Sequence, residues 1–483
     1  MNKKRILYFL FTAVVIFAAA VYFVKNDYAH AENETSRLAV IESVVDHGTF
    51  DITDSMFKTP DKALLNGKYY GDKPPLLTFL SMGEYLILSK VFGMTFQSHY
   101  HTVIFLLYLP YFLIGCACGF LFYAALNRYI GQTSSRAYRI TAAVLSVIST
   151  LIFSYSVTIG NHVPTAALLL WLLLQMDETV KNQYSRASLI LCGIITGLIF
   201  NCEFVTGGAF AAGVFFFVVA APAENYMIRI KRGAWYSCSV LALIALEGVM
   251  NCISYGSPLP LYLLTHKPDM AHKDYLYYAW NVLFGFEGFF LYMPACLFLF
   301  PVLCKDFPGR NRVCYYMLGS TLLASILFII ATSDYGGFCY GYRFMIPFAP
   351  ILLLYIFLSF HAKKKKGLCG LLFCIALGWG VLTAFFGVQN PWNSGYEGSL
   401  TPKGNFNEKI RNGFLGNVYV FCYERDPDSA LTKFFIERVY GPQIAWLYLY
   451  EEFLNRNHDW KVEPAYWHFR KNYFSASPTA DGQ

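Results

Sequence analysis

Long apolar segments separated by short polar ones dominate the pattern along this 483-residue chain. A helix of about 20 consecutive apolar residues crosses the hydrocarbon core of a bilayer. Eleven segments approach this length, although the fourth is short and the fifth and sixth are closely joined, so the count is open by one or two. The pattern predicts an all-α polytopic membrane protein with about eleven transmembrane helices. The predicted spans are 6–24, 102–126, 140–158, 163–176, 187–202, 204–221, 234–253, 289–304, 313–332, 344–360 and 368–388.

The connections between these spans alternate in charge. Every second connection is rich in Lys and Arg, and basic residues stay on the cytoplasmic side of a membrane. The alternation predicts a cytoplasmic N-terminus and an extracytoplasmic C-terminus. The net charge of +7 is therefore an orientation signal, and no nucleic-acid partner is predicted. The first span is predicted to be an uncleaved anchor; the alternative is a signal peptide cleaved near 29–31, and both place residue 32 onward outside.

Composition agrees with a chain embedded in lipid. Hydrophobic residues make up 56% of the chain and charged residues 14%, with a mean hydropathy of +0.40. Soluble proteins carry roughly 25% charged residues, so an ordinary water-soluble enzyme is excluded, as is a disordered chain. The 13 cysteines lie mostly singly inside apolar segments, where a free Cys acts as a small hydrophobic residue. No disulfide framework is predicted.

Most of the remaining polar residues fall on the predicted outer side. They occupy a first loop over about 25–100, a second over about 254–288, and a tail over 389–483. We therefore predict two regions, a transmembrane domain over 1–388, with its candidate active site in the first loop, and a small extracytoplasmic C-terminal region over 389–483. A lipid or sugar transporter would instead place ionisable groups inside its helices near the midplane. Only Glu247 lies squarely inside an apolar segment, so chemistry at the outer face is favoured.

The first outer loop has a recognisable internal order. Apolar residues recur at helical spacing over 33–48, and a glycine is expected to end that helix. An Asn-Gly turn follows at 66–67, and Pro74 and Pro75 open a second apolar helix over 76–92. The pattern predicts amphipathic helices that lie on the outer membrane surface.

Several outer-side stretches carry a resemblance to a known family. They are Asn33-Glu34, Gly48, Asp72-Lys73-Pro74-Pro75-Leu76, and the aromatic- and glycine-rich segments 285–294 and 336–347. In this order they resemble the GT-C superfamily of membrane glycosyltransferases, which includes the protein mannosyltransferases and the bacterial aminoarabinose transferases. Members place an Asp-Glu pair after the first span, then a surface helix that ends in Gly, then an acidic-Lys-Pro-Pro-Leu segment. The resemblance covers about 1–390.

The resemblance implies an inverting glycosyltransferase of the plasma (inner) membrane. Such an enzyme moves a sugar from a polyprenyl-phosphate donor to a lipid, glycan or protein acceptor on the extracytoplasmic face. The reaction requires a cation on the leaving phosphate and a carboxylate that takes the acceptor's proton. Lys73 and Arg343 are predicted to bind the donor phosphate. The alternatives are a Lys73 that only reaches along the membrane interface, and an Arg343 that pairs with Asp334 or a carbonyl.

The chain departs from the family at the catalytic acid. Asn33 stands where the family has Asp, and an amide cannot usefully accept a proton. Glu34 is therefore predicted as the catalytic group that orients or deprotonates the acceptor, with Asn33, Arg37 and Asp72 as accessory residues. The alternatives are another acid of the first loop or an unusual mechanism. The departure also keeps open a protein of the same fold that binds a lipid-linked sugar without catalysis.

A cofactor is left open at this point. Some members of the family use a metal at the lipid phosphate, so a divalent metal is one hypothesis. Asp72 and His266 are the candidate ligands, and His266 lies in a loop with further His and Asp residues. Their spacing matches no established ligand pattern, and ordinary loop polarity is the favoured interpretation.

Overall fold

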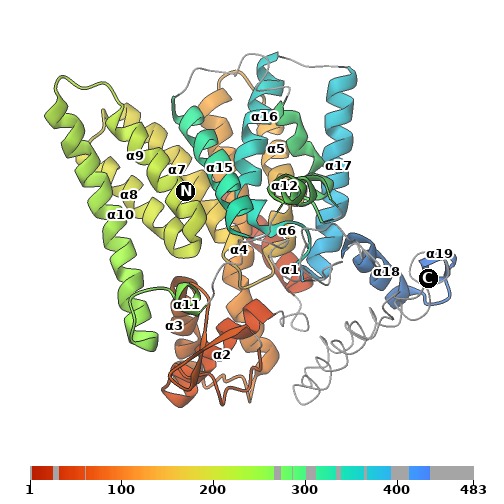
Figure 1. Ribbon diagram of the computed structural model, residues 1–483. Coiled ribbons are helices and arrows are strands. Elements are labelled where there is room, and N and C mark those ends of the chain that lie inside the picture. Colours follow the sequence, from red (N-terminus) through yellow and green to blue (C-terminus); the bar gives the residue numbers. More distant parts are fainter. Residues whose placement is uncertain are drawn as a thin grey trace, which may run out of the picture.

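The computed structural model is almost entirely helical (Figure 1). It describes residues 3–24, 32–59, 61–265, 274–285, 287–300, 312–332, 339–363, 367–392 and 413–435. The elements are α1 (Lys3–Phe23), α2 (Glu32–His47), β1 (Lys62–Leu65), β2 (Lys68–Gly71), α3 (Pro75–Phe92), α4 (Tyr100–Ile130), α5 (Arg136–Ile148), α6 (Leu151–Tyr155), α7 (His162–Lys181), α8 (Arg186–Cys202), α9 (Phe204–Val219), α10 (Tyr226–Tyr255), α11 (Leu261–Thr265), α12 (Tyr275–Phe284), α13 (Phe289–Tyr292), η1 (Pro294–Phe298), α15 (Arg312–Ala331), η2 (Arg343–Phe348), α16 (Ala349–Lys363), α17 (Leu368–Gln389), α18 (Gly413–Arg425) and α19 (Ala430–Phe434).

The chain is a multi-pass membrane protein. Among the described residues, seven helical segments are long and apolar enough to cross a membrane, and α8, α9 and part of α1 are shorter apolar helices. The predicted number of about eleven crossings stays a prediction. The seven segments are α3, α4, α7, α10, α15, η2 with α16, and α17.

Some predicted spans are interrupted. The predicted span 140–158 divides into α5 and α6 because the hydroxyls of Ser149 and Thr150 donate to carbonyls of the preceding turn, and Thr150 Oγ1 then accepts from the Ile152 N–H. The predicted span 289–304 divides into α13 and η1 at Pro294, which cannot continue a helix. The predicted span 344–360 begins as η2, whose interior holds Pro347.

Small residues allow the helices to pack closely. A Cβ at Gly193 of α8 would lie 2.5 Å from the Tyr236 carbonyl of α10, and one at Gly197 would lie 2.5 Å from Leu243 Cβ. On the other side of this layer, a Cβ at Gly213 of α9 would lie 1.9 Å from Ser320 Oγ of α15. Close packing of this kind is the usual basis of helix association in lipid, where the hydrophobic effect does not drive helices together.

Three of the predicted basic connections contact one another at one end of the bundle. Arg128 at the end of α4 donates to Asp177 (2.5 Å) and Glu178 (2.6 Å) at the end of α7. Nearby, Thr133 bonds to His361 of α16 at 3.0 Å. The first loop, with α2 and α3, lies at the opposite end (Figure 1). This arrangement agrees with the alternating charge pattern, while the side that faces the cytoplasm stays a prediction.

The prediction of an amphipathic surface helix over 33–48 is wrong in one respect. The segment does form α2, but the helix is covered on nearly every side rather than lying with a polar face in water. Glu34, Arg37 and Glu42 are as buried as Leu38 and Ile41. The polar side chains can be buried because partners from other segments reach them. α2 is thus largely buried inside the protein.

A β-hairpin joins α2 to α3. β1 and β2 are antiparallel, and their turn has positive φ at Asn66 (52°) and Gly67 (78°), as the Asn-Gly pair predicts. Gly71, the last residue of the hairpin, packs closely against α2: a Cβ built on Gly71 would lie 2.7 Å from Val40 Cγ2. The contact fixes the start of the segment that carries Asp72 and Lys73.

Replacing Gly71 with alanine is expected to destabilise this junction. The added methyl group would overlap with Val40, and overpacking of this kind costs about 1–3 kcal/mol. The measurement is the Tm of the detergent-purified protein. Gly83→Ala is the matched control, because a Cβ at Gly83 of α3 meets no atom within 4 Å. Equal Tm values for the two variants would contradict the close contact.

One buried carboxylate links three distant parts of the chain. Glu287 accepts from the Tyr292 hydroxyl (2.6 Å), the Gly341 N–H (2.9 Å) and the Gly413 N–H (2.7 Å). Through Gly413 it anchors α18, the first described helix of the tail. The division of the chain at 388 stays a prediction, and the described part of the tail packs against α17.

Candidate functional site

The predicted site residues come from distant segments and lie in one region. Glu34 belongs to α2, Lys73 precedes α3, and Arg343 opens η2. Trp392, just after α17, links two of them, because its indole lies beside the Glu34 carboxyl and its ring centre is 5.6 Å from the Arg343 guanidinium. Asp61 links Lys73 to the same region, since it is paired with Lys73 and interacts electrostatically with Arg343.

Glu34 is fully buried at the first turn of α2. Its Oε1 accepts a hydrogen bond from the Ile159 N–H at 2.9 Å, and its Oε2 is buried without a partner among the described residues. Burial raises the pKa of Glu34 to about 8, although Ile159, Tyr108 and Trp392 act in the opposite direction. At neutral pH the carboxyl is therefore mostly protonated and can donate a hydrogen bond.

The neighbouring Asn33 is half-buried. Its side-chain carbonyl oxygen is buried and has no partner among the described residues. A buried amide oxygen without a donor is costly unless a ligand supplies one. The position where the family has an acid is thus a hydrogen-bond acceptor directed into the protein.

Arg37 joins the two motifs of the first loop. Its Nη1 donates to the Pro74 carbonyl (3.0 Å) and to Thr78 Oγ1 (2.9 Å), and the side chain is buried. These bonds hold α2 against the start of α3, and hence against the Asp72-Lys73 pair. Arg37 was predicted as an accessory residue, and the structure places it between the motifs.

Lys73 is held by two carboxylates. It forms ion pairs with Asp61 and with Asp72, the latter at 3.2 Å. Burial alone would raise the pKa of Asp61, but the Lys73 ammonium lowers it below its usual range. Burial raises the pKa of Asp72, and the adjacent Asp61 adds to this shift. No sequence pattern pointed to Asp61 as a partner of Lys73, because the hairpin separates the two residues along the chain.

The described residues do not fit a metal at this position. The carboxylates of Asp61 and Asp72 are both directed to Lys73. Within the described part of the chain, no group of three or more His, Cys, Asp or Glu side chains is placed to hold a metal ion. His266, the other candidate ligand, lies outside the described residues.

Arg343 differs from the other two cations. Its guanidinium lies 5.4 Å from the Phe344 ring centre and 5.6 Å from that of Trp392, and its Nε is buried without a partner. Among the described residues, no carboxylate lies within ion-pair distance of it; Asp334, the predicted alternative partner, is outside them. An arginine held by aromatic rings and without an acid is a typical anion-binding group.

A His–Glu pair, which was not predicted from the sequence, completes the region. His162 begins α7, and its Nδ1 is 2.6 Å from Oε1 of Glu203, in the break between α8 and α9. Thr206 donates to the other carboxylate oxygen of Glu203 at 2.7 Å. The two residues are 41 positions apart. Each falls at the boundary of a predicted span, and this position was the only sequence signal that could have pointed to them.

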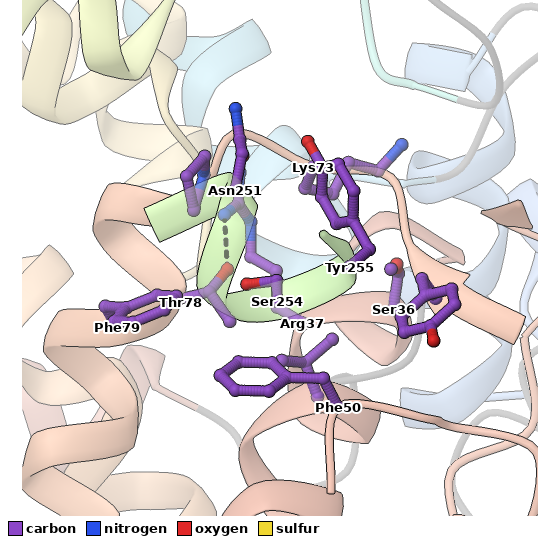
Figure 2. A pocket seen from close by; sticks show the side chains of 13 residues that line it. Ser36, Arg37, Phe50, Lys73, Thr78, Phe79, Asn251, Ser254 and Tyr255 are labelled. Atoms are coloured by element: carbon purple, nitrogen blue, oxygen red, sulfur yellow. Dashed lines mark hydrogen bonds between the residues drawn. The ribbon is translucent and has the colours of Figure 1, made fainter. Parts of the chain in front are cut away.

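A narrow pocket opens beside Arg37 (Figure 2). Arg37, Lys73 and Thr78 lie on its first-loop side, and Ser254 and Tyr255 of α10 lie opposite. Its volume of about 30 Å³ holds only about two water molecules. Lys73 lines this pocket, but Glu34 and Arg343 do not, so the roles predicted for the three residues stay predictions.

Comparisons with known proteins give structural matches only. The chain matches no protein-family model and no curated protein. It is similar to the crystal structure of ArnT from Cupriavidus metallidurans in the apo state, with 13% identity and a TM-score of 0.48, over 93% of this chain and 76% of that one. It is also similar to the same protein bound to undecaprenyl phosphate, with 14% identity and a TM-score of 0.47, over 97% and 81%. ArnT is an aminoarabinose transferase with the GT-C fold, the kind of protein that the sequence motifs resemble.

Proposed function

We propose that the protein is a membrane glycosyltransferase that uses a polyprenyl-phosphate-linked sugar as donor. The observation that carries the proposal is Arg343, a cation in an aromatic frame with no acid partner among the described residues. A cation near a membrane without an acid is stabilised by an anion that arrives with the ligand. The phosphate of a lipid carrier is such an anion.

The remaining residues have distinct roles in this proposal. Lys73 assists Arg343 at the phosphate, and Asp61 and Asp72 hold the Lys73 ammonium in position until the donor arrives. Arg37 ties the two motif segments together. Glu34 orients or deprotonates the acceptor, and the amide oxygen of Asn33 accepts a hydrogen bond from a sugar or acceptor hydroxyl. The reaction inverts the anomeric carbon, on the extracytoplasmic face of the plasma (inner) membrane, with the N-terminus in the cytoplasm and the C-terminus outside.

A second candidate is a protein of this fold that binds a lipid-linked sugar without transferring it. It is favoured by Asn33 in place of the acid and by a Glu34 whose pKa of about 8 leaves it mostly protonated at neutral pH. Both candidates predict that the protein binds the donor. Only the first predicts turnover. A transporter is not favoured, because the charged groups of the described site gather at one end of the bundle.

The test is sugar transfer by detergent-purified protein added to membranes that contain the natural acceptors. The donors are undecaprenyl phosphates that carry radiolabelled hexoses or an aminopentose. Lys73→Ala is expected to lower transfer by about 10²-fold, because it removes one of two cations from the leaving phosphate. Lys68→Ala, an exposed lysine of the same loop, is the control and should transfer at the wild-type rate.

The outcomes separate the two candidates. Transfer that depends on Lys73 supports the enzyme. Saturable binding of undecaprenyl phosphate by the wild type, without transfer from any donor, supports the binding protein. Transfer that is unchanged in Lys73→Ala contradicts the role assigned to this residue.

A further inference from the structure

A His–Glu pair lies inside the bundle next to the proposed donor site. Both side chains are buried, with exposed fractions of 3% and 4%. The Nδ1 of His162 bonds to Glu203, and Glu203 accepts a second bond from Thr206. The carboxylate is thus satisfied on both oxygens. The Nε2 of the imidazole has no hydrogen-bond partner among the described residues.

The surroundings place the imidazole ring beside the proposed site. The imidazole packs edge-on against the Tyr155 ring (6.2 Å between centroids) and the Phe344 ring (6.0 Å). Phe344 is the residue after Arg343, and Tyr155 packs on Trp392 at 5.5 Å. Phe344 therefore lies beside both His162 and Arg343, and Tyr155 connects the imidazole to Trp392, the second ring beside Arg343.

Glu34 reaches the same segment of chain. Its bond to the Ile159 N–H is three residues before His162, and Ile159 lies in the short connection between α6 and α7. Arg343 and Arg37 both act electrostatically on the imidazole. His162 is thus bonded to one carboxylate, packs against the Tyr155 and Phe344 rings, and lies within the electrostatic influence of two guanidiniums.

We propose that His162 is the catalytic base of this site and that Glu203 is its positioning residue. The inference rests on the proposed function. Glu203 accepts the Nδ1–H, which fixes the tautomer that leaves a lone pair on Nε2. The acceptor hydroxyl gives its proton to Nε2, and its oxygen bonds to the anomeric carbon. The bond between that carbon and the phosphate oxygen breaks, and the polyprenyl phosphate leaves with the electron pair. Glu34, protonated, then orients the acceptor.

This assignment explains the departure at Asn33. An imidazole held by a carboxylate replaces the missing acid as proton acceptor, and it is neutral before the reaction. A neutral base suits a site that already holds two arginines, because the imidazolium forms only as negative charge moves to the phosphate. Glu203 stabilises that imidazolium once it has formed.

His162→Asn tests the base while preserving the fold. The asparagine amide takes the place of Nδ1 and can still donate to Glu203, but the side chain has no basic nitrogen. Transfer from the radiolabelled undecaprenyl-phosphate sugars is expected to fall at least about 10²-fold. Binding of undecaprenyl phosphate should stay within about twofold of the wild type, since phosphate binding rests on Lys73 and Arg343. Added imidazole should restore part of the transfer in His162→Ala, which a purely structural histidine would not allow.

The chain offers a matched control in a second His–Glu pair. His47 Nε2 lies 2.8 Å from Glu42 Oε1, but the His47 side chain is 47% exposed at the far end of α2. His47→Asn should transfer at the wild-type rate. Glu203→Gln should lower kcat and leave KM for the donor unchanged, because the neutral amide keeps the Thr206 bond but cannot stabilise the imidazolium.

Each outcome decides the inference. Wild-type transfer with near-normal transfer in His162→Asn overturns the assignment of the base and leaves the proposed function standing. Loss of transfer in His162→Asn together with loss of donor binding also overturns it, since the residue would then be structural. Absence of transfer by the wild type with every donor overturns the proposed function and the inference with it.

Discussion

Arg343→Ala is expected to lower sugar transfer by about 10³-fold, the upper end of what a single charge-stabilising group contributes. The guanidinium lies against two aromatic rings and has no carboxylate partner among the described residues, so its charge is available to the leaving phosphate. Lys73 already shares its charge with Asp61 and Asp72, and its loss should therefore have the smaller effect. The measurement is transfer from radiolabelled undecaprenyl-phosphate sugars, with undecaprenyl phosphate binding in parallel.

Two further variants sharpen this test. Arg343→Lys keeps the charge but loses the planar pair of donors, and should recover part of the activity. Arg425→Ala removes an exposed arginine that lies 3.3 Å from the Phe421 ring centre in α18, and should have no effect on transfer. If Arg343→Ala bound and transferred like the wild type, the anion-binding interpretation of this residue would be wrong.

Glu34→Gln is expected to remove a pH-dependent loss of stability. The pKa of Glu34 is raised to about 8 in the folded protein, and the unfolded chain ionises near the ordinary value of 4.5. The folded state therefore holds a proton that the unfolded state has released. The stabilisation is full below about pH 4.5 and is lost progressively as pH rises to about 8, in total about 5 kcal/mol.

The Glu34→Gln variant separates the ionisation of Glu34 from other pH-dependent contributions to stability. Its amide resembles the protonated carboxyl and can keep the bond with the Ile159 N–H, so it should match the wild type in Tm at pH 5 and exceed it at pH 9. Asp54→Asn, an exposed acid of the same loop, controls for the removal of a charge and should follow the wild-type curve. Parallel pH curves for wild type and Glu34→Gln would show that the buried carboxyl is not protonated.

The sequence predicts the helical segments well, because apolar length alone marks a lipid-buried helix. It also places Glu34 and Lys73 in the first outer loop and Arg343 at the outer end of a predicted span. Their roles stay predictions. The breaks between α5 and α6 and within 289–304 depend on a few hydroxyls and one proline inside apolar segments. The average hydrophobicity of a segment does not reveal these single residues, which interrupt the backbone hydrogen bonds of the helix.

The interior of the site was beyond sequence reasoning. A helix with Glu34, Arg37 and Glu42 is predicted to face water, because nothing local reveals that partners from other segments will cover it. His162 and Glu203 are joined only by the packing of α7 against α8. Asp61 meets Lys73 only after the hairpin folds back. Contacts of this kind depend on the tertiary arrangement of polar groups, which carry no periodic signal.

The carboxylate of Glu287 sets the order in which the site can mature. Its Oε2 accepts a hydrogen bond from the Gly341 N–H, two residues before Arg343, and its Oε1 accepts one from the Gly413 N–H. A ribosome makes residue 413 after every other residue of the site. Until that segment emerges, the buried carboxylate does not have the Gly413 N–H bond that it has in the folded protein, and the loop that carries Arg343 lacks this tie to the tail. The loop that carries Arg343 therefore gains this contact late in synthesis, when the lipid-buried helices have already been made.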